Sequence, residues 1–151
     1  MPVRKLRAVL DTSVLVAGIL QPVGPAGQVL QAFRQGRFTH ITSSAILDEM
    51  VDVLAREKIR RRMKLTRQDI ANLRVAMQQR AETASGEYKN VDLVASDPKD
   101  NPIVSAALEM QADYVVTLDA SDLLPLKVFL ISGHRPVQVD SPTGFLRLLR
   151  R

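Results

Sequence analysis

Short runs of apolar residues alternate along the chain with longer segments in which apolar residues recur at helical spacing. The short runs predict β-strands at 6–10, 38–42, 91–94, 114–118 and 128–131. The longer segments predict helices at 12–20, 26–35, 101–110 and 142–149, with further helices between 44 and 84. Because helices that alternate with strands cover both faces of a parallel sheet, this order predicts an α/β fold, a three-layer α/β/α sandwich with a mostly parallel central sheet.

Capping residues mark where several of these helices begin. Thr12 or Ser13 is expected to cap the first helix, directly after the first strand. Thr66 and Asp69 have the spacing of a capping arrangement, and they open a helix expected to run to about residue 84.

Length and composition are those of an ordinary globular protein. The chain has 151 residues, of which 46% are hydrophobic and 25% charged, and no segment is long enough to be a linker, so one domain over 1–151 is expected. The first apolar run is interrupted by Asp11, and no segment approaches the ~20 apolar residues of a membrane span. A cytoplasmic protein is therefore expected.

The chain contains no cysteine, which excludes disulfides and thiolate metal sites. Carboxylates and the two histidines remain as metal ligands, and carboxylate oxygens favour a hard ion such as Mg²⁺ or Mn²⁺ over zinc. Neither His40 nor His134 has a partner at metal-ligand spacing, so neither is expected to be functional.

The net charge of +5 is unevenly distributed. Residues 1–90 hold 15 Lys and Arg against 8 Asp and Glu, a charge of +7, whereas residues 91–151 hold 6 against 8, a charge of −2. A basic half beside an acidic half suits a polyanionic substrate that approaches an acidic, metal-binding site, although basic proteins of this size are common.

Four acidic residues are expected to gather at one edge of the sheet. Asp11 and Asp119 follow strands, Asp100 directly precedes a helix, and Glu49 lies among the apolar positions of a helix. In a parallel sheet, such strand ends and helix starts share the carboxyl edge, where α/β folds bind ligands. Close carboxylates resist joint ionisation, and a divalent cation removes that penalty.

Each acid also has a purely structural interpretation. Asp11 and Asp100 are suitable helix N-caps, and Asp119 and Asp122 are suitable turn residues. Taken one at a time the structural interpretation is favoured, whereas the four together favour a metal site.

Four segments resemble the PIN-domain family of metal-dependent ribonucleases, in the same order and over nearly the whole chain. They are Arg7-Ala-Val-Leu-Asp-Thr-Ser, Ser43-Ser-Ala-Ile-Leu-Asp-Glu, Asp97-Pro-Lys-Asp-Asn-Pro-Ile and Val116-Thr-Leu-Asp-Ala-Ser-Asp. The resemblance implies metal-binding acids, a small polar residue that hydrogen-bonds among them, and a threonine before the last acid. The positions that match are Asp11, Glu49, Asp100 and Asp119 for the acids, Ser13 for the polar residue and Thr117 for the threonine.

Two positions stay open within this resemblance. The third segment offers Asp97 as well as Asp100, and Asp100 is preferred because it adjoins the helix start. In the fourth segment Asp122 is an alternative or an addition to Asp119 as a metal ligand.

The resemblance implies hydrolysis of RNA phosphodiester bonds by water activated on one or two Mg²⁺ or Mn²⁺ ions. It further implies the toxin component of a bacterial toxin–antitoxin pair, with a cognate antitoxin as partner and pairing into a homodimer. The non-enzymatic alternative is a catalytically weak PIN-like domain that binds nucleic acid or a partner protein for regulation.

Two other enzyme classes that place acids after strands fit less well. Phosphatases of the haloacid dehalogenase type require Asp-x-Asp, and position 13 is a serine. Receiver domains require paired early acids and a late lysine, and neither is convincing here.

A dense basic run follows the segment that bears Glu49. It is interpreted either as an RNA-backbone rim or as a solvated or partner-binding helix. Its members are Arg56, Lys58, Arg60, Arg61, Arg62, Lys64 and Arg67.

Overall fold

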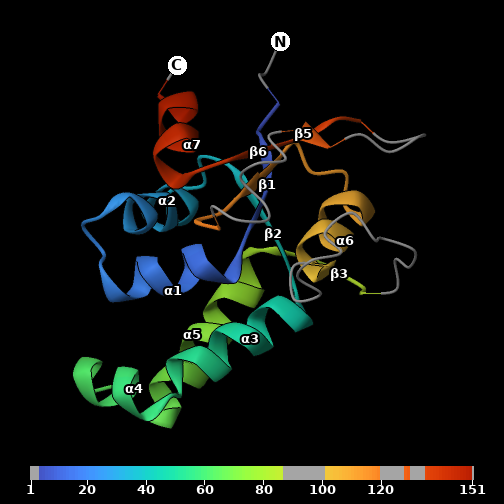
Figure 1. The fold of residues 1–151 in the computed structure, drawn as a ribbon. Helices are drawn as coiled ribbons and strands as arrows, with labels where there is room; N and C mark the ends of the chain where they lie inside the picture. Colours follow the sequence, from blue (N-terminus) through green and yellow to red (C-terminus); the bar gives the residue numbers. More distant parts are fainter. Residues whose placement is uncertain (1–3, 87–100, 120–127, 130–134, 151) are drawn as a thin grey trace.

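The computed structural model describes residues 4–86, 101–119, 128–129 and 135–150, and Figure 1 shows their arrangement. The helices and strands follow in the order β1 (Arg7–Leu10), α1 (Thr12–Leu20), α2 (Pro25–Arg34), β2 (Thr39–Ser43), α3 (Ser44–Leu54), α4 (Glu57–Met63), α5 (Arg67–Arg80), β3 (Glu82–Ala84), α6 (Asn101–Glu109), β4 (Tyr114–Val116), β5 (Val128–Phe129), β6 (Val137–Asp140) and α7 (Pro142–Leu149).

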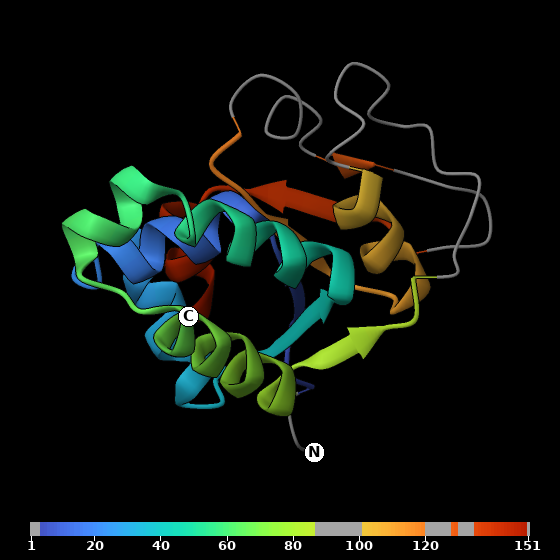
Figure 2. The same cartoon turned by 90° about the horizontal axis from the view of Figure 1, so that it is seen from below.

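The strands form one sheet in the order β3-β2-β1-β4-β6-β5. All neighbours pair in parallel except β5, which runs antiparallel to β6 at the edge. Helices α1, α2 and α7 lie on one side of the sheet and α6 on the other, as Figures 1 and 2 show from two directions. The predicted α/β sandwich with a mostly parallel central sheet is therefore confirmed.

The central strand β1 is buried on both faces. Ala8, Val9 and Leu10 are completely inaccessible to solvent, as expected for a strand with helices above and below it. On the α7 side, the ring of Phe145 packs edge-on against Phe38 with 5.0 Å between ring centroids. This tight core fixes the position at which β1 ends and therefore the position of Asp11.

Two strands differ from the sequence-based prediction. The helix opened by Thr66 ends at Arg80, and Glu82–Ala84 forms β3 instead of the end of that helix. The strand β6 was not predicted, although Val137–Asp140 alternates buried and more exposed positions. Both strands are stabilised by pairing with strands distant in sequence, which local periodicity does not report. The strand predicted at 91–94 lies outside the described residues.

Helices α1 and α2 pack closely against each other. A Cβ atom on Gly18 would lie 2.5 Å from Leu30 Cδ1, and one on Gly27 would overlap the carbonyl group of Pro22. Within the described part of the chain, no single helix is long and apolar enough to span a membrane, and only α1 and α2 together, bent by 97°, have the length and composition for it.

Candidate active site

Asp11 stands at the carboxyl end of β1, where its side chain is held by two hydroxyl groups. Ser13 Oγ donates to Asp11 Oδ2 at 2.9 Å, and Thr117 Oγ1 donates to the same oxygen at 2.7 Å. The residue is 6% exposed, and no described residue donates to Oδ1. The carboxylate is thus fixed in orientation through one oxygen, which leaves the other as a possible ligand atom.

The predicted cap of α1 was wrong. Asp11 itself occupies the N-cap position, with Thr12 and Ser13 inside the helix, and the Asp11 side chain makes no capping hydrogen bond. A structural N-cap would turn its oxygen to the N–H groups of the first helical turn. In this structure the hydroxyl groups of Ser13 and Thr117 bind Asp11 Oδ2 instead, so the Asp11 side chain does not cap the helix.

Thr117 joins the end of β4 to this carboxylate. It is completely buried, and while its hydroxyl donates to Asp11 it also accepts from the backbone N–H of Asp119 at 2.9 Å. Ser13 Oγ likewise accepts from the Leu118 N–H at 3.2 Å. The structure therefore brings together Asp11, Ser13, Thr117 and the backbone of Asp119, all of which were named from the sequence.

Glu49 reaches the same region from α3, which packs on α1. Its Oε2 accepts a hydrogen bond of 3.3 Å from the hydroxyl of Thr12, which is 5% exposed. Thr12 is thus a member of the site that sequence reasoning treated only as a helix cap. The signal that would have identified it is its position between Asp11 and Ser13, where the first turn of α1 faces α3.

The other predicted acids, Asp97, Asp100 and Asp122, lie outside the described residues. Among the residues that the structure describes, no three Asp, Glu, His or Cys side chains form a group able to hold a metal ion. Asp11, Glu49 and Asp119 supply donors of the kind that Mg²⁺ and Mn²⁺ prefer, since all are carboxylate oxygens. The donor chemistry fits these ions, but a complete ligand set needs more than these residues.

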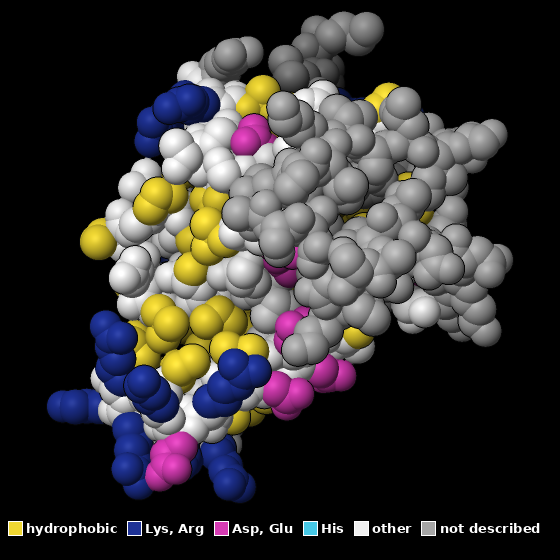
Figure 3. All heavy atoms as spheres, viewed as in Figure 1, with side chains coloured by type: hydrophobic (Ala, Val, Ile, Leu, Met, Phe, Trp, Pro, Cys, Tyr) yellow, Lys and Arg dark blue, Asp and Glu magenta, His cyan; other side chains and the backbone are white. Residues whose placement is uncertain are grey.

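Helix α4 places residues of the basic run on two of its faces. Lys58 and Arg62 line a groove of about 380 Å³ against α1, whereas Arg60 lines a separate groove against α3 and α5. Arg61 instead pairs with Glu57, one helical turn away, at 2.5 Å. Figure 3 shows the Lys and Arg side chains gathered over α4, beside a hydrophobic patch. The basic run, which was interpreted either as an RNA-backbone rim or as a solvated or partner-binding helix, thus lines two separate grooves, with Arg56 at the N-cap and Lys64 at the C-cap of the helix.

His40 lies in the interior, away from the carboxylates. It is fully buried on β2, neither ring nitrogen has a hydrogen-bond partner, and its ring lies edge-on to Phe33 with 4.6 Å between centroids. Desolvation lowers the pKa of His40 to about 3. A neutral core histidine agrees with the expectation that it is not a metal ligand, and His134 lies outside the described residues.

The parallel sheet and the oriented carboxylate define the class of fold: an α/β domain with the Asp11 carboxylate at the carboxyl edge of its sheet, the edge at which α/β folds bind ligands. The chain belongs to the PIN domain family, whose model matches residues 7–121. No curated protein matches the chain. PIN domains are generally nucleases. The matched region begins with β1 and contains every predicted acid except Asp122, which follows it.

Proposed function

We propose that this protein is a metal-dependent endoribonuclease that hydrolyses RNA phosphodiester bonds. The observation that carries the proposal is the orientation of Asp11 by Ser13 and Thr117, which fixes one carboxylate oxygen and leaves the other available. Such a carboxylate at a sheet edge is suited to ligand binding rather than to helix capping. Membership of a family that generally consists of nucleases supports the same activity.

Asp11, Glu49, Asp100 and Asp119 would hold Mg²⁺ or Mn²⁺, with Asp97 and Asp122 as neighbouring acids. A bound ion supplies a lowered pKa for its water and stabilises charge on the leaving oxygen. The other residues of the site position these carboxylates. Ser13 and Thr117 hold the Asp11 carboxylate in one orientation, and Thr12 holds Glu49 by a hydrogen bond. No side chain is required as a covalent nucleophile.

RNA as substrate and the role of a toxin rest on the motif resemblance, with support from the basic surfaces on α4. Backbone phosphates supply most of the sequence-independent affinity for nucleic acids, and Lys58, Arg60 and Arg62 are available for that contact near α1 and α3. A cognate antitoxin and a homodimer belong to the same proposal. Growth arrest on expression, relieved by co-expression of a neighbouring small gene, is the expected cellular result.

The decisive experiment uses the purified full chain and end-labelled single-stranded RNA. Cleavage should require Mn²⁺ or Mg²⁺, stop on chelation, and fall at least a hundredfold in Asp11→Asn, which keeps the shape of the side chain. Asp52→Asn makes the same chemical change at an exposed position of α3 and should cut like the wild type. Metal-dependent cleavage that survives in Asp11→Asn would refute the proposal.

A nucleic-acid-binding protein with weak or no catalysis is the second candidate. The observation that supports it is the pair of basic surfaces on α4, because backbone phosphates bind such surfaces whether or not the acids hold an ion. The same labelled RNA distinguishes the nuclease from the binding protein. A binding protein slows the migration of the RNA in a gel at every metal concentration and produces no fragments.

A further inference from the structure

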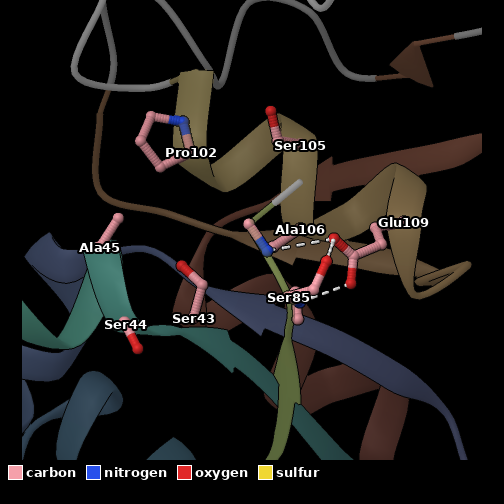
Figure 4. A pocket seen from close by; sticks show the side chains of 10 residues that line it. Ser43, Ser44, Ala45, Ser85, Pro102, Ser105, Ala106 and Glu109 are labelled. Atoms are coloured by element: carbon pink, nitrogen blue, oxygen red, sulfur yellow. Dashed lines mark hydrogen bonds between the residues drawn. The ribbon is translucent and has the colours of Figure 1, made fainter. Parts of the chain in front are cut away.

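A pocket of about 340 Å³ opens beside the proposed catalytic carboxylates, between the start of α3, the end of β3 and the helix α6. Figure 4 shows this pocket, with the Ser43 hydroxyl, the Ala45 methyl group and the Pro102 ring around the same space. Its volume lies in the range of small-molecule sites, at the lower end. The proposed nuclease function assigns no role to this pocket.

The strand register sets its distance from Asp11. Val9 pairs with Ile41, and extending this register by two residues, one past the end of β1, places Asp11 beside Ser43, which pairs with Ala84. Neighbouring strands lie about 4.8 Å apart. The nearest wall of the pocket is therefore about one strand spacing from the backbone of the proposed catalytic acid, within the reach of a single nucleotide.

The walls of the pocket suit a flat, uncharged group. Ala45, Ala84, Pro102 and Ala106 contribute small apolar surfaces, and no lysine or arginine is among the described residues that line it. The Glu109 carboxylate also lines the pocket. The described part of this lining favours an occupant that is neutral and partly apolar.

The Ser43 hydroxyl provides a polar contact. Ser43 is 4% exposed, and its Oγ accepts from the Ile46 N–H at 3.3 Å, while no described residue accepts its proton. A buried hydroxyl keeps a strong tendency to donate, so this proton favours an acceptor within the pocket. Ser105 lines the pocket from α6, with its hydroxyl pointing away from Ser43.

One wall is also held firmly in place. Glu109 accepts from the backbone N–H of Ser85 at 2.6 Å, from its hydroxyl at 2.9 Å, and from the Gly86 N–H at 3.2 Å. Gly86 has a φ of 82°, a conformation that favours glycine. These bonds preorganise the segment after β3, so the pocket has a defined shape before a ligand binds.

We propose that this pocket binds the nucleobase adjacent to the scissile phosphodiester and so sets the base preference of cleavage. The inference rests on the proposed nuclease function, because the substrate strand must cross the carboxyl edge at Asp11. The apolar walls contact the faces of the base, and the Ser43 hydroxyl contacts its edge. A substrate without a matching base is then cut more slowly, although the carboxylates are unchanged.

The test fills the pocket without altering the core. Ala45 is exposed near the start of α3, so Ala45→Leu should fold normally while its side chain occupies the space. Ala76→Leu on the exposed side of α5 is the matched control, and Ser105→Leu fills the pocket from the other wall if Ala45→Leu does not fold. With a randomised RNA, the wild type and Ala76→Leu should share a preferred base at one position beside the cut. Ala45→Leu should lose that preference and cut the preferred sequence about tenfold more slowly.

A second measurement keeps the pocket separate from catalysis. Each of the four nucleoside 5′-monophosphates is titrated into the protein, with Ser85 and Ala106 amide resonances as reporters. At least one nucleotide should shift them, inorganic phosphate should not, and Ala45→Leu should abolish the shift. Unchanged resonances with all four nucleotides, an equal shift with phosphate alone, or an unaltered cleavage pattern in Ala45→Leu each overturn the proposal. Absence of cleavage together with a base-dependent shift would refute the nuclease function and leave the base site standing.

Discussion

The buried imidazole of His40 makes the folded protein sensitive to mild acid. Its two ring nitrogens have no hydrogen-bond partner, and burial lowers its pKa from 6.5 to about 3. Because the folded-state pKa is lowered, the unfolded chain binds a proton that the folded protein does not. The stability associated with neutral His40 is present above pH 6.5 and is lost as the pH falls from there toward 3.

The size of this loss follows from the two pKa values. At pH 5 the imidazole of His40 is protonated in the unfolded chain and neutral in the folded protein. This pH lies 1.5 units below the unfolded pKa of 6.5. Each unit corresponds to about 1.4 kcal/mol, so the free energy of unfolding falls by about 2 kcal/mol between pH 7 and pH 5. The pKa of Asp69 is lowered by its bonds to Thr66, but its effect begins below its usual value of 3.8, outside this range.

The assay is urea denaturation of the wild type and His40→Leu at pH 7, 6 and 5. Leucine has a similar volume and no ring nitrogens to leave unpaired, so the variant should be more stable than the wild type at pH 7 by about 1 kcal/mol. The difference between the two proteins should then grow by about 2 kcal/mol at pH 5. Other titrating groups, His134 among them, are common to both proteins and cancel. Equal pH dependence in both would show that His40 is not the group responsible.

Three further substitutions test the site and the local structure. Thr117→Val keeps the shape of the side chain but removes a donor to the buried Asp11 carboxylate, so it should cost about 2 kcal/mol in urea denaturation and lower kcat in the RNA assay. An unchanged kcat would show that the Thr117 hydroxyl has no role in catalysis. Gly27→Ala should be strongly destabilising because its Cβ overlaps backbone, whereas Gly24→Ala, with 3.5 Å of clearance, should be tolerated, and equal melting temperatures would contradict this. Thr66→Ala removes the capping bond from the Asp69 N–H to Thr66 Oγ1, while the bond from the Thr66 N–H to Asp69 remains, and should lower the free energy of unfolding by about 1 kcal/mol, measured in urea.

Much of the site could be placed from the sequence because it depends on where strands end. An apolar run that stops at an acid places Asp11 at a strand end, and the same pattern before Asp119 predicts that the two lie at one edge of a parallel sheet. The pairing of β1 with β4 confirms that prediction, with Leu10 opposite Val116. Only residues close in the chain and a general property of parallel sheets enter this inference.

The hydrogen bonds of Asp11 could not be predicted in the same way. Local sequence allowed the side chain to cap α1, and the decision against capping comes from Thr117, which is distant in sequence and reaches Asp11 through the sheet. The pocket beside Ser43 has the same origin, since its walls come from three elements that meet only after β2 and β3 pair.

The amino-acid sequence alone determined the alternation of strands and helices, the parallel sheet and the edge at which Asp11 and Asp119 lie, because these follow from apolar periodicity and strand ends. The tertiary structure alone decided that Glu82–Ala84 and Val137–Asp140 are strands, and that α4 divides its basic residues between two faces. It also left His40 without a partner in the core. The physical reason is that pairing with a distant strand, burial, and the choice among hydrogen-bond partners depend on contacts between remote residues, whose energies exceed local preferences.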